Sequence, residues 1–259
     1  MNNSYINIEN LSLSFLNKEG KLDVLNDISL SIERNEFISI LGPSGCGKTT
    51  LLKVIGGIEP NHSELKGTVT INNSSPKDFK ANGQVGFAFQ NPVLLEWLTV
   101  ADNVKLPLKL LSIPNTEETI TKSLNTVGMA DFRNAYPSEL SGGMKQRVNM
   151  ARTLVHNPKL LLLDEPFGSL DEVSRLQLNY ELRKIVKSGD YTTLLVTHSL
   201  REALILSDRI FILSNRPGKV YDVYMPKKKE DKSIGYETSI KFNEELKALT
   251  DKFLDVAND

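Results

Sequence analysis

The sequence lacks the features that place a protein outside the cell or across a membrane. Its 259 residues include a single cysteine, Cys46, so no internal disulfide can form. The first residues show no apolar segment of a secretory signal, and this absence, together with the lone cysteine, indicates a reducing cytoplasm. No apolar run approaches the roughly eighteen residues that span a bilayer. If the chain works at a membrane, we expect partner proteins to hold it peripherally at the cytoplasmic face.

Neither sign of charge is in excess. Lys and Arg total 31 and Asp and Glu total 32, which gives a net charge of -1. A balanced charge provides no general attraction to nucleic acid or anionic lipid, so we expect no nucleic-acid partner, and any anion site must be local. The length allows one large domain or two small ones. A fold of this size buries roughly three quarters of the surface of its unfolded chain.

A glycine-rich stretch after an apolar strand indicates such a local anion site. Residues 37–41 are more continuously apolar than the preceding segments, as in a strand buried on both faces, and a helix that begins at Thr49 is predicted to stop at Gly56-Gly57. The loop between them offers backbone N–H groups that converge on phosphate where glycine leaves room. The stretch reads Gly42, Pro43, Ser44, Gly45, Cys46, Gly47, Lys48, Thr49 and Thr50. Lys48 is placed to reach the β and γ phosphates, and Thr49 to offer a hydroxyl to Mg²⁺. The alternative is a glycine-rich turn, against which the flanking strand and helix argue.

A second apolar strand ends in two acids. Residues 160–163 are all leucine, and they lead into Asp164 and Glu165. An unpaired carboxylate at the end of a buried strand is costly, so Mg²⁺ held by Asp164, through water, is the expected compensation. Glu165, one residue further on, is placed to polarise an attacking water. The alternative is an acid pair that only opens a loop before Pro166.

A third motif, Leu140-Ser141-Gly142-Gly143-Met144-Lys145-Gln146-Arg147, lies between the other two. In this order and spacing, the three motifs resemble the nucleotide-binding subunit of an ABC transporter, over roughly residues 5–222. The resemblance implies an α/β fold: a P-loop NTPase core with a RecA-like parallel sheet, an antiparallel β subdomain and an inserted α-helical subdomain. It also implies an ATPase that binds ATP and Mg²⁺.

The resemblance assigns roles to single residues. Glu165 is the general base, and Lys48, Gln90 and His198 complete the catalytic set. The Mg²⁺ ligands that it implies are Thr49, Gln90 and Asp164. The nucleotide contacts that it implies are Phe15 on the adenine, the loop of residues 42–50 on the phosphates, and Ser141, Gly142, Gly143, Gln146 and Asp171. Taken alone, Gln90 is an ordinary residue at a strand end, His198 a histidine at a helix entry, and Phe15 a core side chain of an alternating strand.

Charge balance indicates that one chain alone does not complete its ATP site. ATP brings about four negative charges, of which Mg²⁺ offsets about two, Lys48 about one and a helix N-terminus about half. The remainder favours a second helix N-terminus, and Ser141-Gly142-Gly143 opens such a helix. The resemblance implies a homodimer of two copies facing head to tail, each signature closing over the ATP of the other. Ser169-Leu170-Asp171 resembles the segment that links the two sites.

We expect a single ABC ATPase domain over residues 1–259. Residues 1–90 and 158–224 are predicted to form the nucleotide-binding core with its antiparallel β subdomain, and residues 91–157 the helical insert with the signature. Residues 225–259 are predicted to form a tail that carries a last helix near residues 242–256. Residues 227–232, rich in lysine, are expected to be a solvated connector.

Several local features follow from the pattern of the insert and the loops. A first insert helix is predicted over residues 101–111, and a second, capped by Asn115, with an apolar face of Ile120, Leu124 and Val127. Residues 72–82 are predicted to be a polar turn region. The remaining histidines, His62 and His156, match no motif and are expected at the surface.

The segment of residues 94–104 is the expected contact with a membrane subunit. Trp97 lies there among leucines, as suits the anchor of an interface; the alternative is that Trp97 belongs to the core of the insert. This segment and residues 213–220 resemble importers for nitrate, sulfonates and taurine. The resemblance implies a complex of two ATPases, two membrane-spanning permease subunits and an external solute-binding protein. The other functions considered are a soluble ABC-type mechanical ATPase without a permease and a stand-alone kinase, which has no use for the signature motif.

Overall fold

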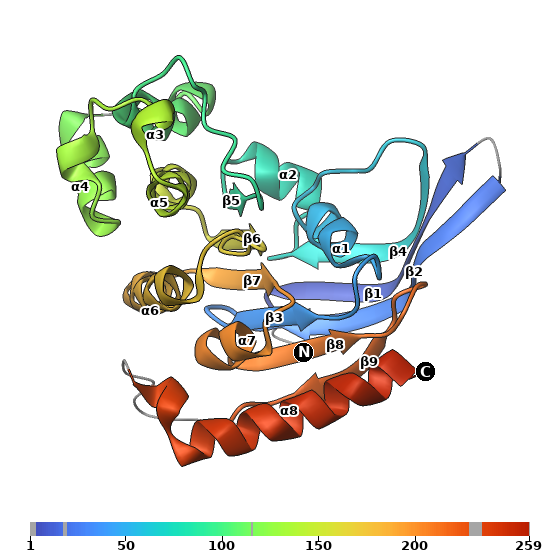
Figure 1. Ribbon diagram of the computed structural model, residues 1–259. Helices are drawn as coiled ribbons and strands as arrows, with labels where there is room; N and C mark the ends of the chain where they lie inside the picture. Colours follow the sequence, from blue (N-terminus) through green and yellow to red (C-terminus); the bar gives the residue numbers. More distant parts are fainter. Residues whose placement is uncertain (1–3, 18–19, 115, 228–234, 259) are drawn as a thin grey trace. The chain divides into compact units, whose positions relative to one another are not determined.

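Two units make up the chain, and the second lies within the first in sequence. The structure, a computed structural model, describes residues 4–17, 20–114, 116–227 and 235–258. Unit 1 comprises Met1–Asn82 and Tyr191–Asp259, and unit 2 comprises Gly83–Asp190 (Figure 1). Each unit has its own strands, helices and buried side chains.

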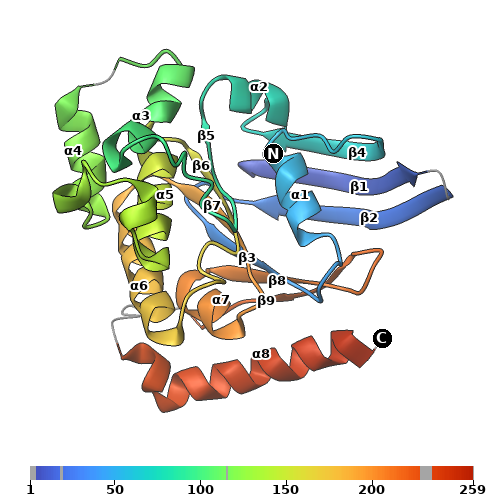
Figure 2. The same cartoon turned by 45° about the horizontal axis from the view of Figure 1, so that its top comes forward.

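An antiparallel sheet forms the first part of unit 1. Strands β1 (Ile6–Asn17), β2 (Gly20–Ile32) and β4 (Ser63–Ile71) pair in the order β2-β1-β4, as Figure 2 shows. Side chains along these strands alternate between buried and more exposed positions: Ile6 and Ile8 are buried whereas Asn7 between them is not. The antiparallel β subdomain that the resemblance implied is present in this sheet.

The second part of unit 1 is built on parallel strands. Strands β3 (Phe37–Leu41), β7 (Thr192–Val196) and β8 (Arg209–Leu213) run parallel with β3 in the middle, and β9 (Val220–Tyr224) joins β8 antiparallel. Every residue of β3 and of β7 is buried, which explains why both read as continuous apolar or small-polar runs. Helices α1 (Lys48–Ile55) and α7 (Leu200–Leu206) pack on β7 and β3.

The predicted polar turn region of residues 72–82 is wrong in part, because it contains helix α2 (Pro76–Ala81). Ser75 caps this helix by accepting a hydrogen bond from the N–H of Asp78 at 3.2 Å, and Pro76 occupies the first turn. Phe79 is buried and meets the ring of Tyr5 edge to face. The cap and the proline were the sequence signal of a helix start.

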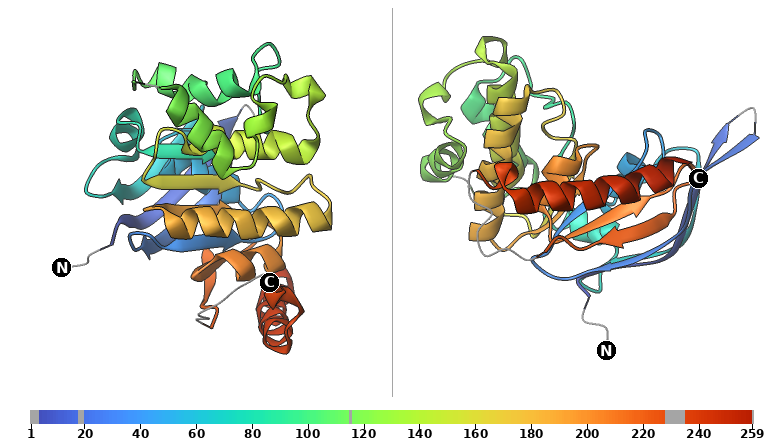
Figure 3. Two further views of the ribbon diagram at one scale, coloured as in Figure 1. Left: turned by 90° about the vertical axis from the view of Figure 1, so that its left-hand side faces the viewer. Right: turned by 60° about the horizontal axis from the view of Figure 1, so that its bottom comes forward.

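A long C-terminal helix completes unit 1. Helix α8 (Ile240–Asn258) follows the short 3₁₀ turn η3 (Tyr236–Thr238) and lies along α7 and β9, as the right-hand view of Figure 3 shows in red and orange. Its buried side chains Phe242, Leu249 and Val256 recur every seven residues, so one stripe of the helix faces the unit. The helix predicted near residues 242–256 is confirmed. Of the predicted connector, residues 228–232 lie outside the described part of the chain.

Unit 2 combines a pair of parallel strands with helices. Strands β5 (Val85–Ala88) and β6 (Leu160–Asp164) pair in parallel, with Val85 opposite Leu160. The helices of unit 2 are α3 (Val100–Leu110), α4 (Glu117–Thr126), α5 (Gly142–Leu154) and α6 (Glu172–Ser188), with 3₁₀ turns η1 (Ala130–Phe132) and η2 (Pro137–Glu139). Helices α3, α4 and α5 contact one another and appear in green in the left-hand view of Figure 3. The fold is mixed α/β with parallel strands, an antiparallel sheet and a helical segment, as predicted.

The helix predictions for unit 2 are confirmed, except for one cap. The predicted face of Ile120, Leu124 and Val127 is buried. Asn115, the predicted cap of α4, lies outside the described residues, and the cap is Thr116, whose hydroxyl accepts a hydrogen bond from the N–H of Thr119 at 3.1 Å. Both residue types cap helices well, so sequence did not distinguish the two positions.

His156 is not the surface residue that sequence predicted. The side chain follows α5 and is half-buried, with Nε2 3.1 Å from the carbonyl oxygen of Val85. Its Nδ1 is buried and has no hydrogen-bond partner among the described residues. Burial lowers the pKa of His156 below its usual value of 6.5, and the hydrogen bond to Val85 only partly opposes this shift. The neutral ring is therefore the folded form.

This burial predicts a pH dependence of stability. The unfolded chain protonates His156 near its usual pKa of 6.5, whereas the folded chain resists protonation, so the stabilisation is complete above that pH and is lost as pH falls through the lower pKa of the folded state. His156→Gln keeps an N–H donor for Val85 but does not titrate. Urea unfolding at pH about 7.5 and about 5.5 should show a smaller loss of stability for the variant than for wild type. His62→Gln, at an exposed position, is the control; equal losses in all three proteins would contradict the prediction.

Candidate active site

The glycine-rich loop joins β3 to α1 in a conformation that only glycine adopts easily at its end. Gly47 is the N-cap of α1 with φ 105°, in the left-handed region, and its carbonyl accepts the first helical hydrogen bond from Leu51 at 2.8 Å. A Cβ atom at this position would lie 2.7 Å from Cδ2 of Leu25. Both the turn and the packing beneath it therefore require glycine at position 47.

The other two glycines of the loop differ from each other. Gly45 has φ 78°, and a Cβ there would meet no atom within 4 Å, so its open side is free for a ligand. A Cβ on Gly42 would instead lie 2.8 Å from Sγ of Cys46 and 3.1 Å from the carbonyl oxygen of Leu213. The predicted reason for glycine, room for phosphate, fits Gly45, whereas Gly42 is needed for packing within unit 1.

Lys48 is held inside the loop by its own chain. The ammonium group donates hydrogen bonds to the carbonyl oxygens of Gly42 at 2.7 Å and Pro43 at 2.8 Å, and the residue is only 8% exposed. These carbonyls fix the positive charge of Lys48 at the centre of the loop. Thr49 and Thr50 follow directly at the start of α1 and are half-buried.

The thiol of Cys46 is not placed to act as a reactive group. Its side chain is buried, and burial raises the pKa of the thiol, a shift that nearby Lys48 only partly opposes. A protonated, enclosed thiol is a poor nucleophile. The role of the Cys46 side chain is therefore to pack closely against Gly42.

His198 lies on a loop that neighbouring polar groups hold in place. The hydroxyl of Thr197 donates to the carboxylate of buried Glu202 and accepts a hydrogen bond from the N–H of Ser199 at 3.0 Å. Ser199 in turn caps α7. His198 itself is exposed, so its side chain is accessible to a ligand.

Phe15 has an intermediate position. It lies on β1 opposite Leu22 of β2 and Ser63 of β4, and its side chain is half-buried. The ring is neither enclosed as a core residue nor fully exposed. The roles that sequence proposed for Phe15, adenine stacking and core packing, are both compatible with this exposure.

In unit 2 the two acids leave the end of β6 in different ways. Asp164 is the last residue of the strand and is 6% exposed. Glu165 has φ 44°, in the left-handed region, where a residue other than glycine is uncommon. Its carbonyl accepts a hydrogen bond from the N–H of Gly168 at 3.1 Å, which closes a tight turn. This turn leaves the Glu165 side chain partly exposed while Asp164 stays buried.

The Glu165 carboxylate has a defined neighbour. The side-chain amide of Gln90 donates to Oε2 of Glu165 at 3.3 Å, so the second residue after β5 meets the first residue after β6. The amide of Gln146 donates to the main-chain carbonyl of Gln90 at 3.1 Å. Sequence predicted both glutamines as site residues but not this contact, and it assigned Gln146 to the nucleotide. The side chain of Gln146 is 3% exposed and bonds within unit 2 instead.

The signature motif opens α5 with an accessible N-terminus. Ser141 caps the helix by accepting a hydrogen bond from the N–H of Met144 at 3.3 Å, and no acidic residue lies in the first turn. Ser141 and Gly142 are exposed, and a Cβ on Gly143 would meet no atom within 4 Å. The partial positive charge of the helix end is therefore open on this side.

Asp171 is the cap of α6. Its carboxylate accepts a hydrogen bond from the N–H of Ser174 at 3.0 Å, and hydrogen bonds from Ser174 lower the pKa of the carboxyl. The residue is exposed, so its carboxylate is accessible as well as capping.

Comparison with known proteins decides the family. A family model described as ABC transporter matches residues 25–168. The chain belongs to the ABC transporter family. It is 41% identical over 220 residues to an uncharacterised ABC transporter ATP-binding protein of Methanocaldococcus jannaschii, covering 84% of this chain and 80% of the relative. It is 38% identical over 218 residues to the aliphatic sulfonates import ATP-binding protein SsuB of Bacillus cereus, with 84% of each chain covered.

Solved structures agree with this assignment. The dimeric post-hydrolysis state of the ATP-binding cassette MJ0796 bound to ADP and Pi matches with a TM-score of 0.75 and 29% identity. The match covers 86% of this chain and all of that chain. The predicted fold class and the predicted ATPase activity are confirmed by these similarities. Within the described ranges no helix of this ABC protein is both long and apolar enough to cross a bilayer.

Trp97 of the ABC protein is exposed, not core. The side chain is 74% exposed on the segment between β5 and α3. Asn103, fully buried in α3, holds this segment: its Oδ1 accepts from the N–H of Leu95 at 2.8 Å, and its Nδ2 donates to the carbonyls of Leu95, Leu98 and Thr99. Sequence analysis missed this role of Asn103, for which a polar residue on the apolar face of a helix was the only signal.

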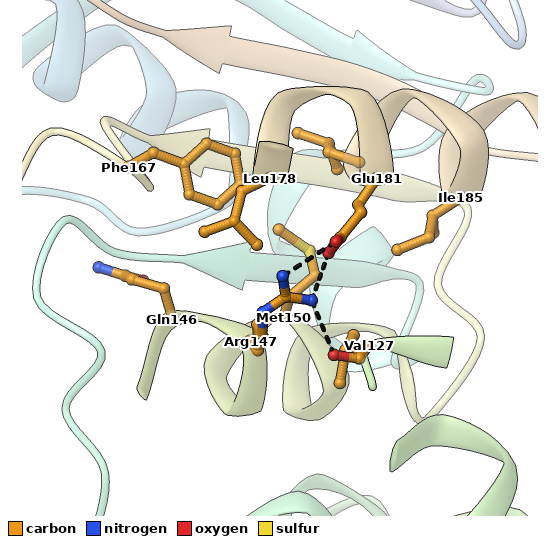
Figure 4. Close-up of a pocket in the computed structure, with 9 residues that line it drawn as sticks. Val127, Gln146, Arg147, Met150, Phe167, Leu178, Glu181 and Ile185 are labelled. Atoms are coloured by element: carbon orange, nitrogen blue, oxygen red, sulfur yellow. Dashed lines mark hydrogen bonds and ion pairs between the residues drawn. The ribbon is translucent and has the colours of Figure 1, made fainter. Parts of the chain in front are cut away.

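Arg147, the last signature residue, ties helices together within unit 2 (Figure 4). Its guanidinium donates two parallel hydrogen bonds to the Glu181 carboxylate on α6, one of them at 2.9 Å, and one to the carbonyl of Val127 at 3.1 Å. The cavity beside this pair measures about 10 Å³, so it has room for no more than one water molecule. Arg147 is thus a structural link, and the cavity is not a ligand site.

Removing this link should destabilise the protein. A charge-assisted pair is worth about 1.5–3 kcal/mol, and partial exposure of Glu181 weakens it, so Arg147→Ala should lower the free energy of unfolding by about 1–2 kcal/mol. Urea unfolding measures the change. The control is Lys159→Ala, which removes a more exposed pair with Asp190 in the same unit and should leave the midpoint almost unchanged. Equal effects of the two substitutions would be evidence against the link.

Proposed function

We propose that this chain is the ATP-hydrolysing subunit of an importer, and that two copies close around two ATP molecules to drive partner membrane subunits. The observation that carries the proposal is the accessible start of α5. Ser141, Gly142 and Gly143 present a helix N-terminus with no acid in its first turn, Ser141 and Gly142 are exposed, and a Cβ on Gly143 would meet no atom within 4 Å. Such an end attracts phosphate.

ATP is bound by the loop between β3 and α1 in this proposal. Backbone N–H groups of residues 42–50 and the Lys48 ammonium contact the phosphates, and Phe15 stacks on the adenine. The donors of Thr49, Gln90 and Asp164 are all oxygens, which is the ligand type that Mg²⁺ prefers, so these residues fit the ion. When bound, Mg²⁺ supplies positive charge that offsets the charge of the phosphates.

Hydrolysis follows from the acids and amides described above. Glu165 accepts a proton from water, whose oxygen attacks the γ phosphorus while the bond to the β–γ bridging oxygen breaks, giving ADP and phosphate. Gln90 donates to the Glu165 carboxylate and thereby sets its orientation. His198 and Lys48 stabilise the charge of the γ phosphate.

A second copy completes the site. Its Ser141, Gly142 and Gly143 add a helix N-terminus to the γ phosphate, and its Asp171 links the two sites. Dimers of the cassette MJ0796, one of them with ADP and Pi, support this arrangement. Loss of the γ phosphate removes the group that both copies contact, so hydrolysis favours opening.

The transported solute is a small solute of the nitrate, sulfonate or taurine type or a related organic solute. Support comes from relatives named for aliphatic sulfonate import, including one of Pseudomonas syringae that is 42% identical over 199 residues. Trp97 anchors the contact with two membrane-spanning permease subunits at the cytoplasmic face, and an external solute-binding protein selects the solute. Since the family model and the named relatives are those of transporters, a soluble mechanical ATPase without a permease is not favoured.

Substitution of the general base tests the shared site. Glu165→Gln removes the proton acceptor but keeps the shape, so turnover should fall by about 10²-fold or more while an ATP-bound dimer accumulates. Light scattering at saturating ATP measures the mass. Glu165→Gln combined with Lys48→Ala should stay monomeric, because the phosphates then lose the loop cation. A Glu165→Gln protein that is monomeric at saturating ATP would refute the proposed dimer.

Substitution of Trp97 tests the membrane contact. Trp97→Ala should reduce co-purification with the cognate permease severalfold and leave ATP binding nearly unchanged, because interface anchors carry most of the binding energy. Ile240→Ala is the matched control, since Ile240 is 79% exposed but lies on α8. If both variants co-purify equally with the permease, the docking role of Trp97 is wrong.

A further inference from the structure

We propose that Gln146 is a positioning residue for hydrolysis, because its amide holds the main chain at Gln90 so that the Gln90 side chain meets Glu165. The inference rests on the roles proposed for Gln90 and Glu165. It moves Gln146 from the nucleotide, where its motif placed it, to the interior of unit 2.

The segment after β5 needs an external hold. Strand β5 ends at Ala88, and Phe89, Gln90 and Asn91 are exposed. The carbonyls of this segment meet side chains of α5. The Gln146 amide donates to the carbonyl of Gln90 at 3.1 Å, and Arg152 donates to the carbonyls of Pro92 and Val93. Helix α5 therefore fixes the course of the chain through Gln90.

Gln146 bonds to the main chain of Gln90, the residue whose side chain contacts Glu165. Arg152 holds positions two and three residues further on, whereas Gln146 bonds the carbonyl of Gln90 itself. Fixing this carbonyl fixes the peptide plane, and with it the direction in which the Gln90 side chain leaves the chain. The Gln146 amide is 3% exposed, so water does not readily replace it.

The contact that Gln146 maintains is sensitive to small displacements. The amide of Gln90 is 3.3 Å from Oε2 of Glu165, near the upper limit for an N–H···O hydrogen bond. A shift of the Gln90 main chain by about 1 Å would break it, and misplacement on that scale costs catalysts up to about 10²-fold. Loss of the Gln146 bond should thus disturb the orientation of the Glu165 carboxylate without removing any nucleotide contact.

The position of Gln146 also links the helix that begins at the signature motif to Gln90. Gln146 lies on the first turns of α5, the helix whose N-terminus faces the nucleotide of the second copy in the proposed dimer. Through its amide, this helix bears directly on Gln90 of its own chain.

The test compares two buried polar residues of α5 in the full-length protein. Gln146→Met keeps the size of the side chain but removes the donor, and should lower kcat about tenfold with KM for Mg-ATP within about twofold of wild type. Thr153→Val is the matched control: Thr153 is also buried, and its hydroxyl donates to the carbonyl of Asn149 within α5 at 2.8 Å and not to the segment that contains Gln90. It should lose similar thermal stability and retain kcat.

A double substitution separates positioning from general support of the fold. In a Gln90→Ala background no side chain remains to be oriented, so adding Gln146→Met should lower kcat no further. Independent, multiplying losses would overturn the proposal, as would wild-type kcat in Gln146→Met alone. If Gln146→Met does not fold, Gln146→Glu of equal length, which accepts rather than donates, should show the same loss of kcat. Should Gln90→Ala and Glu165→Gln themselves keep wild-type turnover, the proposed function fails rather than the role of Gln146.

Discussion

A polar side chain enclosed by protein is costly to leave without a hydrogen-bonding partner, and helix α5 carries several polar side chains that are buried or half-buried. Leaving a buried donor or acceptor unpaired costs about 1–3 kcal/mol, so the partners of these side chains are strongly selected during folding. Gln146 bonds Gln90, Arg147 bonds Glu181, and Arg152 bonds the chain after β5. The same helix begins at the signature motif. The course of unit 2 near the Glu165 carboxylate therefore depends on polar groups of one helix more than on its apolar stripe.

Unit 1 meets a different constraint, that of enclosing a lysine ammonium within the glycine-rich loop. A lysine ammonium with little exposure needs oxygen partners, and Lys48 takes two carbonyls of its own loop. These carbonyls are presented at the right distance because Gly42 packs closely on Cys46 beneath them. The loop is thus stiffened from below, and its open side at Gly45 stays available. Rigid support under an accessible cation is the general requirement of a preorganised anion site.

Sequence predicted the parts of the fold where chemistry and local pattern agree. Strand β3, the glycine-rich loop and strand β6 followed from largely apolar runs that end in glycines or acids, and the last helix followed from the apolar pattern near residues 242–256. Helix α2 was not predicted, because the residues around it are polar. Ser75 and Pro76 are nevertheless typical of a helix start. His156 was misplaced because its burial depends on Val85, which lies 71 positions away. Such distant contacts leave no trace in periodicity.

In the candidate site, too, local motifs identified single residues, whereas contacts between distant residues depend on the fold. The motifs named Gln90, Gln146 and Glu165, but the bond between the two glutamines joins positions 56 apart, and only the fold brings them together. Because Trp97 lies among leucines, the sequence was compatible with either a core or an interface position. In the structure Trp97 is exposed, on a segment that Asn103 fixes with four hydrogen bonds. Exposing a large aromatic ring forfeits the free energy of burying it. A chain that exposes such a ring and also fixes the neighbouring backbone has already lost the conformational entropy that ordering for a contact would cost, which fits the docking role proposed for Trp97.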